Sequence, residues 1–224
     1  MRTLFAAILL LSAGALARTE DRDVPEFSAV HVCCGITATI EIGPRKALHI
    51  EGDDESLAAL ETVVTGGDLA IFYRPNTNLR GERHLKVSIQ TPSLRGVGAS
   101  GGSIVRASLT RGQSNDIQAS GGSEIHLRGV DAARLSAQAS GGSILTISGE
   151  ADSLDLQLSG GSQLHGHDLS VKDLDIQGSG GSQADLRASG SIHGGLSGGS
   201  QLHARGAART RVSTSGGSQV DIDD

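Results

Sequence analysis

The tetrapeptide Ser-Gly-Gly-Ser recurs seven times in the second half of the chain, and this repeat constrains the fold more than any other feature. The copies begin at Ser100, Ser120, Ser140, Ser159, Ser179, Ser197 and Ser215. The steps between them are 20, 20, 19, 20, 18 and 18 residues. A unit this short cannot enclose a hydrophobic core by itself, so it must stack on its neighbours. The sequence therefore predicts a repeat fold with rungs of 18 to 20 residues.

Apolar and polar residues alternate after each motif. The second position after the motif is apolar in every copy: Val105, Ile125, Leu145, Leu164, Ala184, Leu202 and Val220. The first position is mostly polar: Ile104, Glu124, Ile144, Gln163, Gln183, Gln201 and Gln219. Side chains in a strand point alternately to opposite faces, so we expect the apolar column to face inward and the polar column outward.

The residues before each motif alternate in the same way. One inward column is expected to hold Ile117, Ala137, Leu156, Ile176 and Val212, and the outward column beside it holds Gln118, Gln138, Gln157 and Gln177. Glycine suits the corner between two strands because it tolerates a positive φ, and stacked serines can hydrogen-bond the backbone there. The sequence predicts an all-β chain folded as a parallel β-helix or β-solenoid, and leaves the number of faces per coil open.

The first half of the chain is expected to form β-structure that caps the array. Strands are predicted around 36–42, 48–50 and 85–89, a helical turn over 55–60 after an Asp cap, and a hairpin over 63–73. We expect a single domain over 18–224, with N-terminal coils and cap over 24–98 and the repeat array over 99–224. At the far end, carboxylates from Asp221 to Asp224 are expected to repel pairing with another strand.

Residues 1–17 have the pattern of a secretory signal peptide. Arg2 precedes the apolar run 4–11, and Ala15-Leu16-Ala17 is a small-x-small cleavage site. The apolar run is too short to span a bilayer, and no later segment is apolar enough to do so. The sequence therefore predicts an exported protein without a transmembrane segment in its mature form.

Several segments, in order along the chain, resemble the putative auto-transporter adhesin, head GIN domain family of exported bacterial proteins. They are 24–30 (Val-Pro-Glu-Phe-Ser-Ala-Val), 39–43, 48–53, 67–71, the strand ending at Pro92, and then the Ser-Gly rungs. The resemblance covers almost the whole chain after residue 17. It implies a β-helix-like envelope or secreted protein of a bacterium, in the periplasm, at the cell surface or in the medium, and it brings no catalytic residues with it.

The two cysteines, Cys33 and Cys34, are adjacent. Alternation from Val32 places Cys34 inward and Cys33 outward, which favours one core thiol and one edge thiol. An intermolecular bridge through Cys33 and a vicinal disulfide are the alternatives, since disulfides form in exported proteins. Two cysteines without a histidine at ligand spacing do not predict a zinc site.

The sequence offers little enzyme chemistry. Asp116, Asp155 and Asp175 form an outward carboxylate column, for which a solvated face is favoured over a calcium or lyase site. No nucleophile–base set, metal site or cofactor site is predicted. The net charge of −6 and the four aromatic residues of the chain argue against nucleic acid as a partner.

Three functions remain. We favour a non-catalytic envelope or secreted protein that presents a regular surface to an envelope protein or a polysaccharide. A β-helical polysaccharide lyase or hydrolase and a purely structural periplasmic protein are the alternatives. The candidate binding surface is the ladder of Gln163, Gln183, Gln201 and Gln219, which could equally serve only to tie the rungs together. Oligomers could form through Cys33 or through the solenoid edges.

Overall fold

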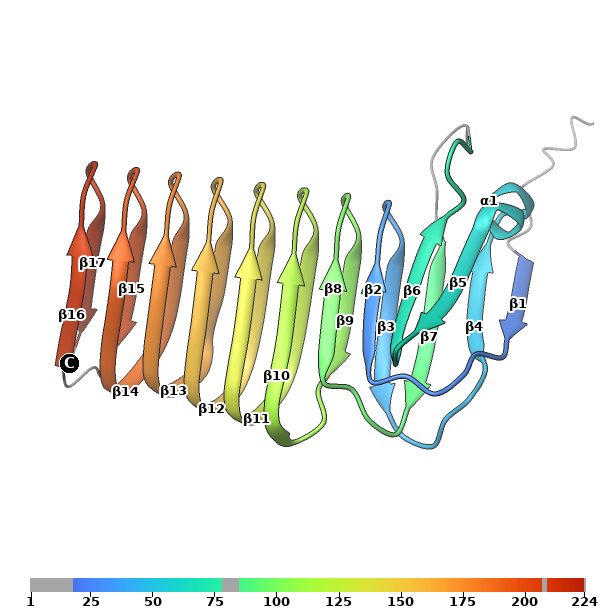
Figure 1. Ribbon diagram of the computed structural model, residues 1–224, viewed down its shortest axis with the longest axis horizontal. Helices are drawn as coiled ribbons and strands as arrows, with labels where there is room; N and C mark the ends of the chain where they lie inside the picture. The colour runs from blue at the N-terminus through green and yellow to red at the C-terminus, as the bar shows by residue number, and fades with distance from the viewer. Residues whose placement is uncertain (1–17, 78–84, 207–208, 224) are drawn as a thin grey trace, which may run out of the picture.

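The computed structural model describes residues 18–77, 85–206 and 209–223, and it shows a flattened β-solenoid of about six coils (Figure 1). The predicted signal peptide, part of the loop after Tyr73 and Asp224 lie outside the described residues. Each coil rises to a Ser-Gly-Gly-Ser turn and descends from it, so a coil has two faces. The predicted β-solenoid is confirmed, and its seven Ser-Gly-Gly-Ser turns stack along one edge.

The strands that run toward the turns form one face, which we call the ascending sheet. It contains β6 (Asp68–Tyr73), β2 (Ala29–Val32), β8 (Gly96–Ala99), β10 (Gly112–Ala119) and β16 (Arg209–Thr214). The second halves of four long strands, β11 (Glu124–Ala139), β12 (Ile144–Leu158), β13 (Gln163–Gly178) and β14 (Gln183–Leu196), lie between β10 and β16. All these pairings are parallel.

The strands that leave the turns form the opposite face, the descending sheet. It contains β7 (Lys86–Thr91), β3 (Thr37–Ile42) and β9 (Ile104–Ser108), then the first halves of β11 to β14, then β15 (Gln201–Arg205) and β17 (Gln219–Asp223). The long strands belong to both sheets because they bend at the edge opposite the turns. Register shifts occur at these bends, for example between Leu127 and Val130.

The N-terminal segment covers the first coil (Figure 1). β4 (Leu48–Gly52) pairs antiparallel with β7, and β1 (Arg18–Arg22) pairs antiparallel with β4. Helix α1 (Asp54–Ala59) leads into β5 (Leu60–Thr65), which forms the predicted hairpin with β6. The carboxylate of Asp53 accepts a hydrogen bond from the backbone N–H of Ser56 and caps α1, as the sequence predicts.

The core lies between the two sheets and consists of aliphatic rows. Leu135, Leu154, Leu174 and Ile192 stand in register in successive coils and are at most 1% exposed. The predicted inward columns are confirmed, except that Val212 and Val220 in the last coil are only partly buried. Ile42, at the end of β3, is 39% exposed. Among the described residues, no helix has the length and hydrophobicity that crossing a membrane requires.

Candidate binding surfaces

The Ser-Gly-Gly-Ser turns fix one edge of both sheets. In these turns the second serine is buried in six of seven copies: Ser103, Ser123, Ser143, Ser162, Ser182 and Ser200. The hydroxyl oxygen of Ser123 lies 2.8 Å from the carbonyl oxygen of Ser120 in its own turn and 2.8 Å from that of Ala99 in the preceding coil. The predicted bonding of stacked serines to the backbone is confirmed, and it leaves the first serine of each turn at the surface.

The first turn of the stack contains the two cysteines instead of this motif. Val32 pairs with Ala99, so residues 33–36 align with residues 100–103. Cys34 has a φ of 72° and donates its backbone N–H to the carbonyl oxygen of Ser100 at 3.1 Å. Cys34 therefore stands where the following turns have their first glycine.

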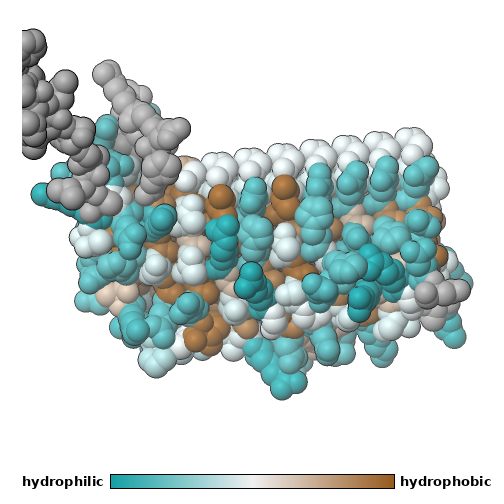
Figure 2. All heavy atoms as spheres, turned by 180° about the vertical axis from the view of Figure 1, so that it is seen from behind, coloured by the Kyte–Doolittle hydropathy of each residue, from teal (hydrophilic) through white to brown (hydrophobic). Residues whose placement is uncertain are grey.

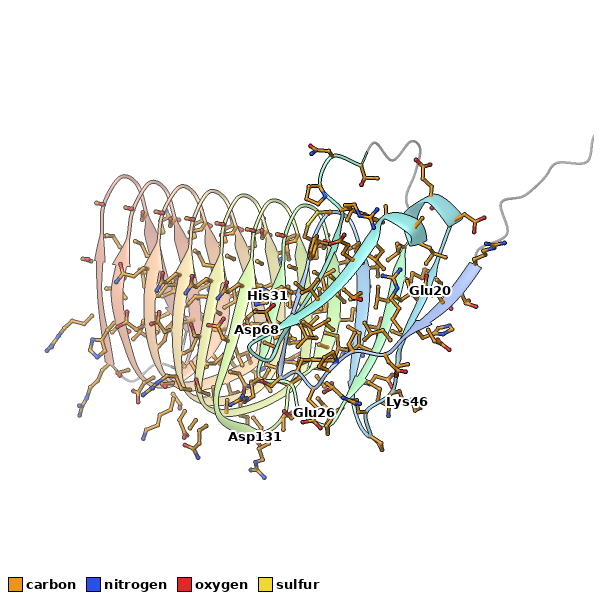
Figure 3. The ribbon with its side chains drawn as sticks, turned by 45° about the vertical axis from the view of Figure 1, so that its right-hand side comes forward. Glu20, Glu26, His31, Lys46, Asp68 and Asp131 are labelled. Atoms are coloured by element: carbon orange, nitrogen blue, oxygen red, sulfur yellow. A yellow bond between two sulfur atoms is a disulfide. The ribbon has the colours of Figure 1, made fainter. Side chains whose placement is uncertain are left out.

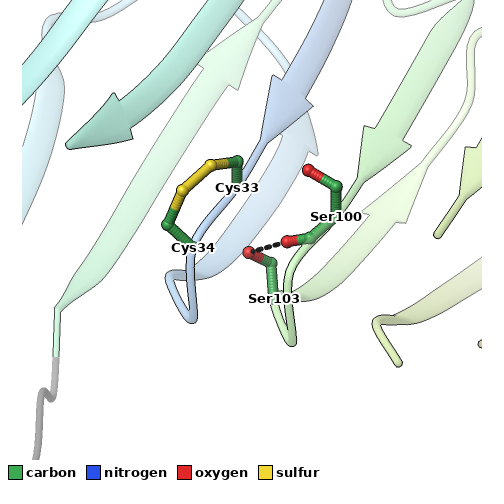
Figure 4. Close-up of a disulfide and its surroundings, with 4 residues drawn as sticks. All are labelled: Cys33, Cys34, Ser100 and Ser103. Atoms are coloured by element: carbon green, nitrogen blue, oxygen red, sulfur yellow. Dashed lines mark hydrogen bonds between the residues drawn. A yellow bond between two sulfur atoms is a disulfide. The ribbon is translucent and has the colours of Figure 1, made fainter. Parts of the chain in front are cut away.

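The sulfur atoms of Cys33 and Cys34 are bonded to each other (Figure 4). The favoured interpretation, separate core and edge thiols, is therefore wrong, and so is an intermolecular bridge through Cys33. Strand alternation does not continue through these residues because they form a turn, which brings both side chains together. The expected contact of Cys34 with the core is present.

A groove of about 880 Å³ follows the outer side of the ascending sheet beside the turns. One wall is an outward row of glutamines in register, which we call the ascending glutamine row: Gln118, Gln138, Gln157 and Gln177. The other wall is the row of first serines of the turns. Between the two rows lie inward-pointing residues, so the floor is formed by backbone and by small or buried side chains such as Ala119 and Ala139.

The N-terminal end of this groove is lined by different types of side chain. His31, Cys33 and Phe72 line it there. His31 lies opposite Gly98, and a Cβ atom at Gly98 would collide with the His31 ring, so the glycine makes room for the imidazole. Figure 3 shows His31 on this outer face, near Asp68. The groove therefore begins at an imidazole and an aromatic ring and continues along amides and hydroxyls.

The predicted ladder forms a second row, on the descending sheet. Gln163, Gln183, Gln201 and Gln219 stand in register in four successive coils and line a smaller depression of about 410 Å³. Figure 2 shows this face, with hydrophilic side chains along the turns over the C-terminal coils. The neighbouring row is charged: Asp185 accepts a hydrogen bond from Arg205 at 3.2 Å, and His203 lies 3.5 Å from Asp221.

The glutamines of both rows lack side-chain hydrogen bonds to one another in the part of the chain that the structure describes. The amide of Gln118 donates to Asp116 at 2.8 Å, within its own strand. Neither row is thus a continuous amide ladder. The amides face outward, where a ligand can reach them.

The carboxylate column lies on the outer surface, as the sequence predicts. Asp155 and Asp175 are neighbours in register, while Ser136 separates Asp116 from Asp155. Within residues 18–77, 85–206 and 209–223, no group of three or more His, Cys, Asp or Glu side chains could hold a metal ion. The column therefore presents a row of single carboxylates on an open face rather than a cleft.

The sequence shows the ascending glutamine row as an outward column, but not that it lines the larger groove. The two rows that form the walls of the groove are uncharged in every coil from β10 to β14. Charge beside the glutamines does not distinguish the two rows, because Asp116, Asp155 and Asp175 lie beside the ascending row and His and Asp residues lie beside Gln163. The participation of Phe72 and His31 could not be found by periodicity, because both lie outside the repeat array.

Comparison with known proteins gives a family and a fold. The model of the family described as putative auto-transporter adhesin, head GIN domain, matches residues 26–208. No curated protein matches the chain. A crystal structure of a putative adhesin from Bacteroides fragilis is similar, with a TM-score of 0.85 and 20% identity over 92% of this chain and 96% of that chain.

Two structures from the genus Parabacteroides have the same fold. A putative adhesin from Parabacteroides merdae has a TM-score of 0.73 and 14% identity, over 93% of this chain and 96% of that one. A putative lipid binding protein from Parabacteroides distasonis has a TM-score of 0.69 and 13% identity, over 93% of this chain and 97% of that one. At these identities the likeness shows the solenoid fold alone.

Proposed function

The chain belongs to the putative auto-transporter adhesin, head GIN domain family, and from this premise we propose that it is a non-catalytic, exported adhesin-type protein that binds an uncharged linear polysaccharide. The binding site is the groove beside the turns of the ascending sheet. The observation that carries this proposal is the repetition of one amide and one hydroxyl, facing each other across the groove, in successive coils.

The groove chemistry suits sugar hydroxyl groups. A glutamine amide both donates and accepts hydrogen bonds, and so does a serine hydroxyl, as do the hydroxyls of a sugar ring. Successive coils repeat these groups at the inter-strand spacing of about 4.8 Å. A polymer laid along the groove meets the same weak contacts in every coil, and its affinity grows with the number of contacts engaged together. Phe72 at the N-terminal end offers a ring face for one sugar.

The charge of the protein favours a neutral polymer. The net charge is −6, so long-range electrostatics disfavour the approach of an acidic polysaccharide. His31 is the single titratable side chain in the groove lining, among described residues, apart from the bonded Cys33. A charged polymer would leave its charges in this groove without partners, and that desolvation is costly.

The test compares two matched fourfold variants. In the first, Gln118, Gln138, Gln157 and Gln177 are changed to Thr; in the second, Gln163, Gln183, Gln201 and Gln219 are changed to Thr. Thr is compatible with strands and removes the amide, so both variants are expected to keep the melting temperature. The probes are soluble neutral β-linked glucan and xylan oligosaccharides of increasing length, with polygalacturonate as the acidic control.

We expect neutral oligosaccharides to bind more tightly as they lengthen, and the first variant to lose this binding while the second keeps it. Loss in the second variant alone would contradict the groove and assign binding to the descending ladder. Loss of stability without loss of binding would make the glutamines structural. No binding of any neutral glycan by the folded protein would overturn the proposal.

The alternative of a polysaccharide lyase or hydrolase predicts turnover. Cleavage of one of these glycans by the wild type, abolished by Asp155→Asn or Asp175→Asn, would make the protein an enzyme. We expect no shortened products after prolonged incubation, because the carboxylates stand in an open row that does not surround a substrate.

Export forms part of the proposal and rests on residues 1–17, together with the family. Cell fractionation of the full-length chain and of a chain lacking residues 2–17 tests it. We expect the full-length protein in the periplasm, at the surface or in the medium, and the truncated protein in the cytoplasm. The same location for both chains would contradict export through this segment.

A further inference from the structure

The last coil has two free strand edges in the described part of the chain. β16 pairs only with β14, and β17 pairs only with β15, so each has one edge without a strand partner. The inward residues Val212, Val220 and Ile222 are only partly buried there, whereas Leu202 and Ala204, which pair with Val220 and Ile222 in the preceding coil, are buried. Free edges beside partly exposed apolar residues are the usual template for pairing with another chain.

The two edges carry opposite charges. The outward residues of β16 are Arg209, Arg211 and Ser213, and those of β17 are Gln219, Asp221 and Asp223. Within the described chain the two arginines make no ion pair, and the carboxylates of the two aspartates form ion pairs only with His203, each at 3.5 Å. One edge is therefore basic and the other acidic, at the same end of the solenoid.

We propose that two copies of this chain stack end to end through this coil, with β16 of each copy pairing antiparallel with β17 of the other. β16 ascends and β17 descends, so a two-fold axis parallel to the strands brings them together in opposite directions. The same axis keeps the turns of both copies on one edge. The contact is isologous and closes as a dimer.

Side-chain alternation and side-chain charge together select the register of this pairing. Outward residues must face outward residues, and of the registers that meet this condition we take the one that pairs both arginines with aspartates: Arg211 lies opposite the partner's Asp221 and Arg209 opposite the partner's Asp223. In the same register Val212 lies beside the partner's Val220 on the inner face of the shared sheet. The symmetry repeats each of these pairs, so four opposite-charge pairs flank the two new strand pairings.

The other two-fold arrangement is disfavoured by the same charges. An axis perpendicular to the sheets would pair β17 with the partner's β17 and β16 with the partner's β16. It would place aspartates against aspartates and arginines against arginines, and like charges directly opposite destabilise a strand pair. The acidic edge thus repels a second acidic edge and accepts the basic one, whereas the sequence alone predicts that these carboxylates repel pairing with any other strand.

Dimerisation would lengthen the proposed binding surface. The ascending glutamine row ends at Gln177, and the next two positions in register are Gly195 and Ser213. In the proposed dimer Ser213 lies opposite the partner's Gln219. Gln219 belongs to the descending ladder. The ascending row of one copy would therefore run on into the descending ladder of the other, on both faces of the dimer.

Sedimentation velocity of the purified protein, with charge-reversal variants, tests the proposal without reference to any glycan. We expect a dimer for the wild type. Arg211→Asp and Asp221→Arg should each raise the dimer dissociation constant by at least about tenfold, because like charges face each other across an interface. The double variant Arg211→Asp/Asp221→Arg should restore dimerisation, since its reversed charges again face opposite ones.

Arg134→Asp is the matched control, because Arg134 is an exposed arginine on the same sheet but within the array, and it should leave the dimer intact. Circular dichroism and melting show that each variant is folded. A monomeric wild type at tens of micromolar would overturn the proposal, as would single variants that dimerise like the wild type or a double variant that stays monomeric. The dimer proposal does not depend on glycan binding, so a protein that dimerises as described but binds no glycan would contradict only the proposed function.

Discussion

The two glycines of each Ser-Gly-Gly-Ser turn both adopt a positive φ, and the first of them also lets successive coils approach closely. Replacement of each glycine in one turn by alanine separates these two roles. Gly180 and Gly181 are adjacent and have φ values of 69° and 80°, so alanine at either position is held in the left-handed region. That conformation costs roughly 1–2 kcal/mol for a residue with a Cβ atom. The two substitutions share this cost and differ in what the new methyl group meets.

A Cβ atom at Gly180 would lie 3.0 Å from the backbone nitrogen of Gly160 in the preceding coil and 3.4 Å from its Cα atom. A Cβ atom at Gly181 would meet nothing within 4 Å. The atoms at Gly160 are backbone and cannot rotate away, so the two coils must separate by a few tenths of an ångström. Overpacking of this kind costs about 1–3 kcal/mol, and Gly180→Ala should be the less stable variant by this amount.

Urea unfolding of the wild type, Gly180→Ala and Gly181→Ala measures this difference directly. In thermal melts, 1 kcal/mol corresponds to a shift of about 2–4 °C for a chain of this size. We expect both variants to be destabilised and Gly180→Ala to melt several degrees below Gly181→Ala. Equal losses would show that the coil spacing at the turns is not set by the first glycine, and would refute the reasoning.

Three further predictions concern the solenoid and its cap. Leu156→Asp should prevent cooperative folding, because the carboxylate would be buried between coils without a partner, whereas Gln157→Asp on the outer face should change the melting temperature by only a few degrees; a normal melt for Leu156→Asp would show that the inward column is misassigned. One residue inserted after Leu156 should be far more harmful than one inserted between His167 and Asp168, where the register already shifts; equal melting temperatures would contradict the strand assignment. Asp53→Ala should cost about 1 kcal/mol at pH 7 through loss of the α1 cap. Hydrogen bonds from Ser56 lower the pKa of the Asp53 carboxyl, so this contribution is present above the pKa of the unfolded chain and lost as the pH falls through the lowered value; a cost that stays constant down to pH 2.5 in urea titrations would contradict it.

The coil interior could be predicted because its periodicities agree. The Ser-Gly-Gly-Ser motif sets the register of each rung, and alternation on both sides then assigns the face of each residue. Leu154 and Leu156 are buried, and Gln157 beside them is exposed, as expected. A wrong register by one residue would have exposed the whole aliphatic set, so the pattern allowed one solution.

The number of faces could not be predicted, because the second edge of the coil has no constant motif. The long strands bend there with register shifts and with 18 to 20 residues per coil, so the bend moves along the sequence. Alternation continues through some bends and fails at others, for example beside Gly129 with its φ of 65°. Stacking, rather than any local signal, decides where these bends fall.

Strand alternation does not predict the disulfide, because the register of Cys33 and Cys34 with Ser100 and Gly101 places both in a turn, where alternation does not hold. The groove also cannot be predicted from a single column of residues. The depth of the groove depends on two outward rows, the ascending glutamines and the first serines of the turns, and on the small residues between them. The sequence of one row therefore does not show which glutamine row lines the larger groove.

The most direct test of the account is a titration that observes the glutamine side chains themselves. Each glutamine amide gives a pair of signals in a ¹H–¹⁵N correlation spectrum, assignable from single Gln→Thr variants. On addition of a neutral β-linked oligosaccharide long enough to cover four coils, we predict shifts for Gln118, Gln138, Gln157 and Gln177 that follow one binding curve. Unchanged signals from these four, with shifts confined to Gln163, Gln183, Gln201 and Gln219 or to none, would contradict the claim that the groove of the ascending sheet is the binding site.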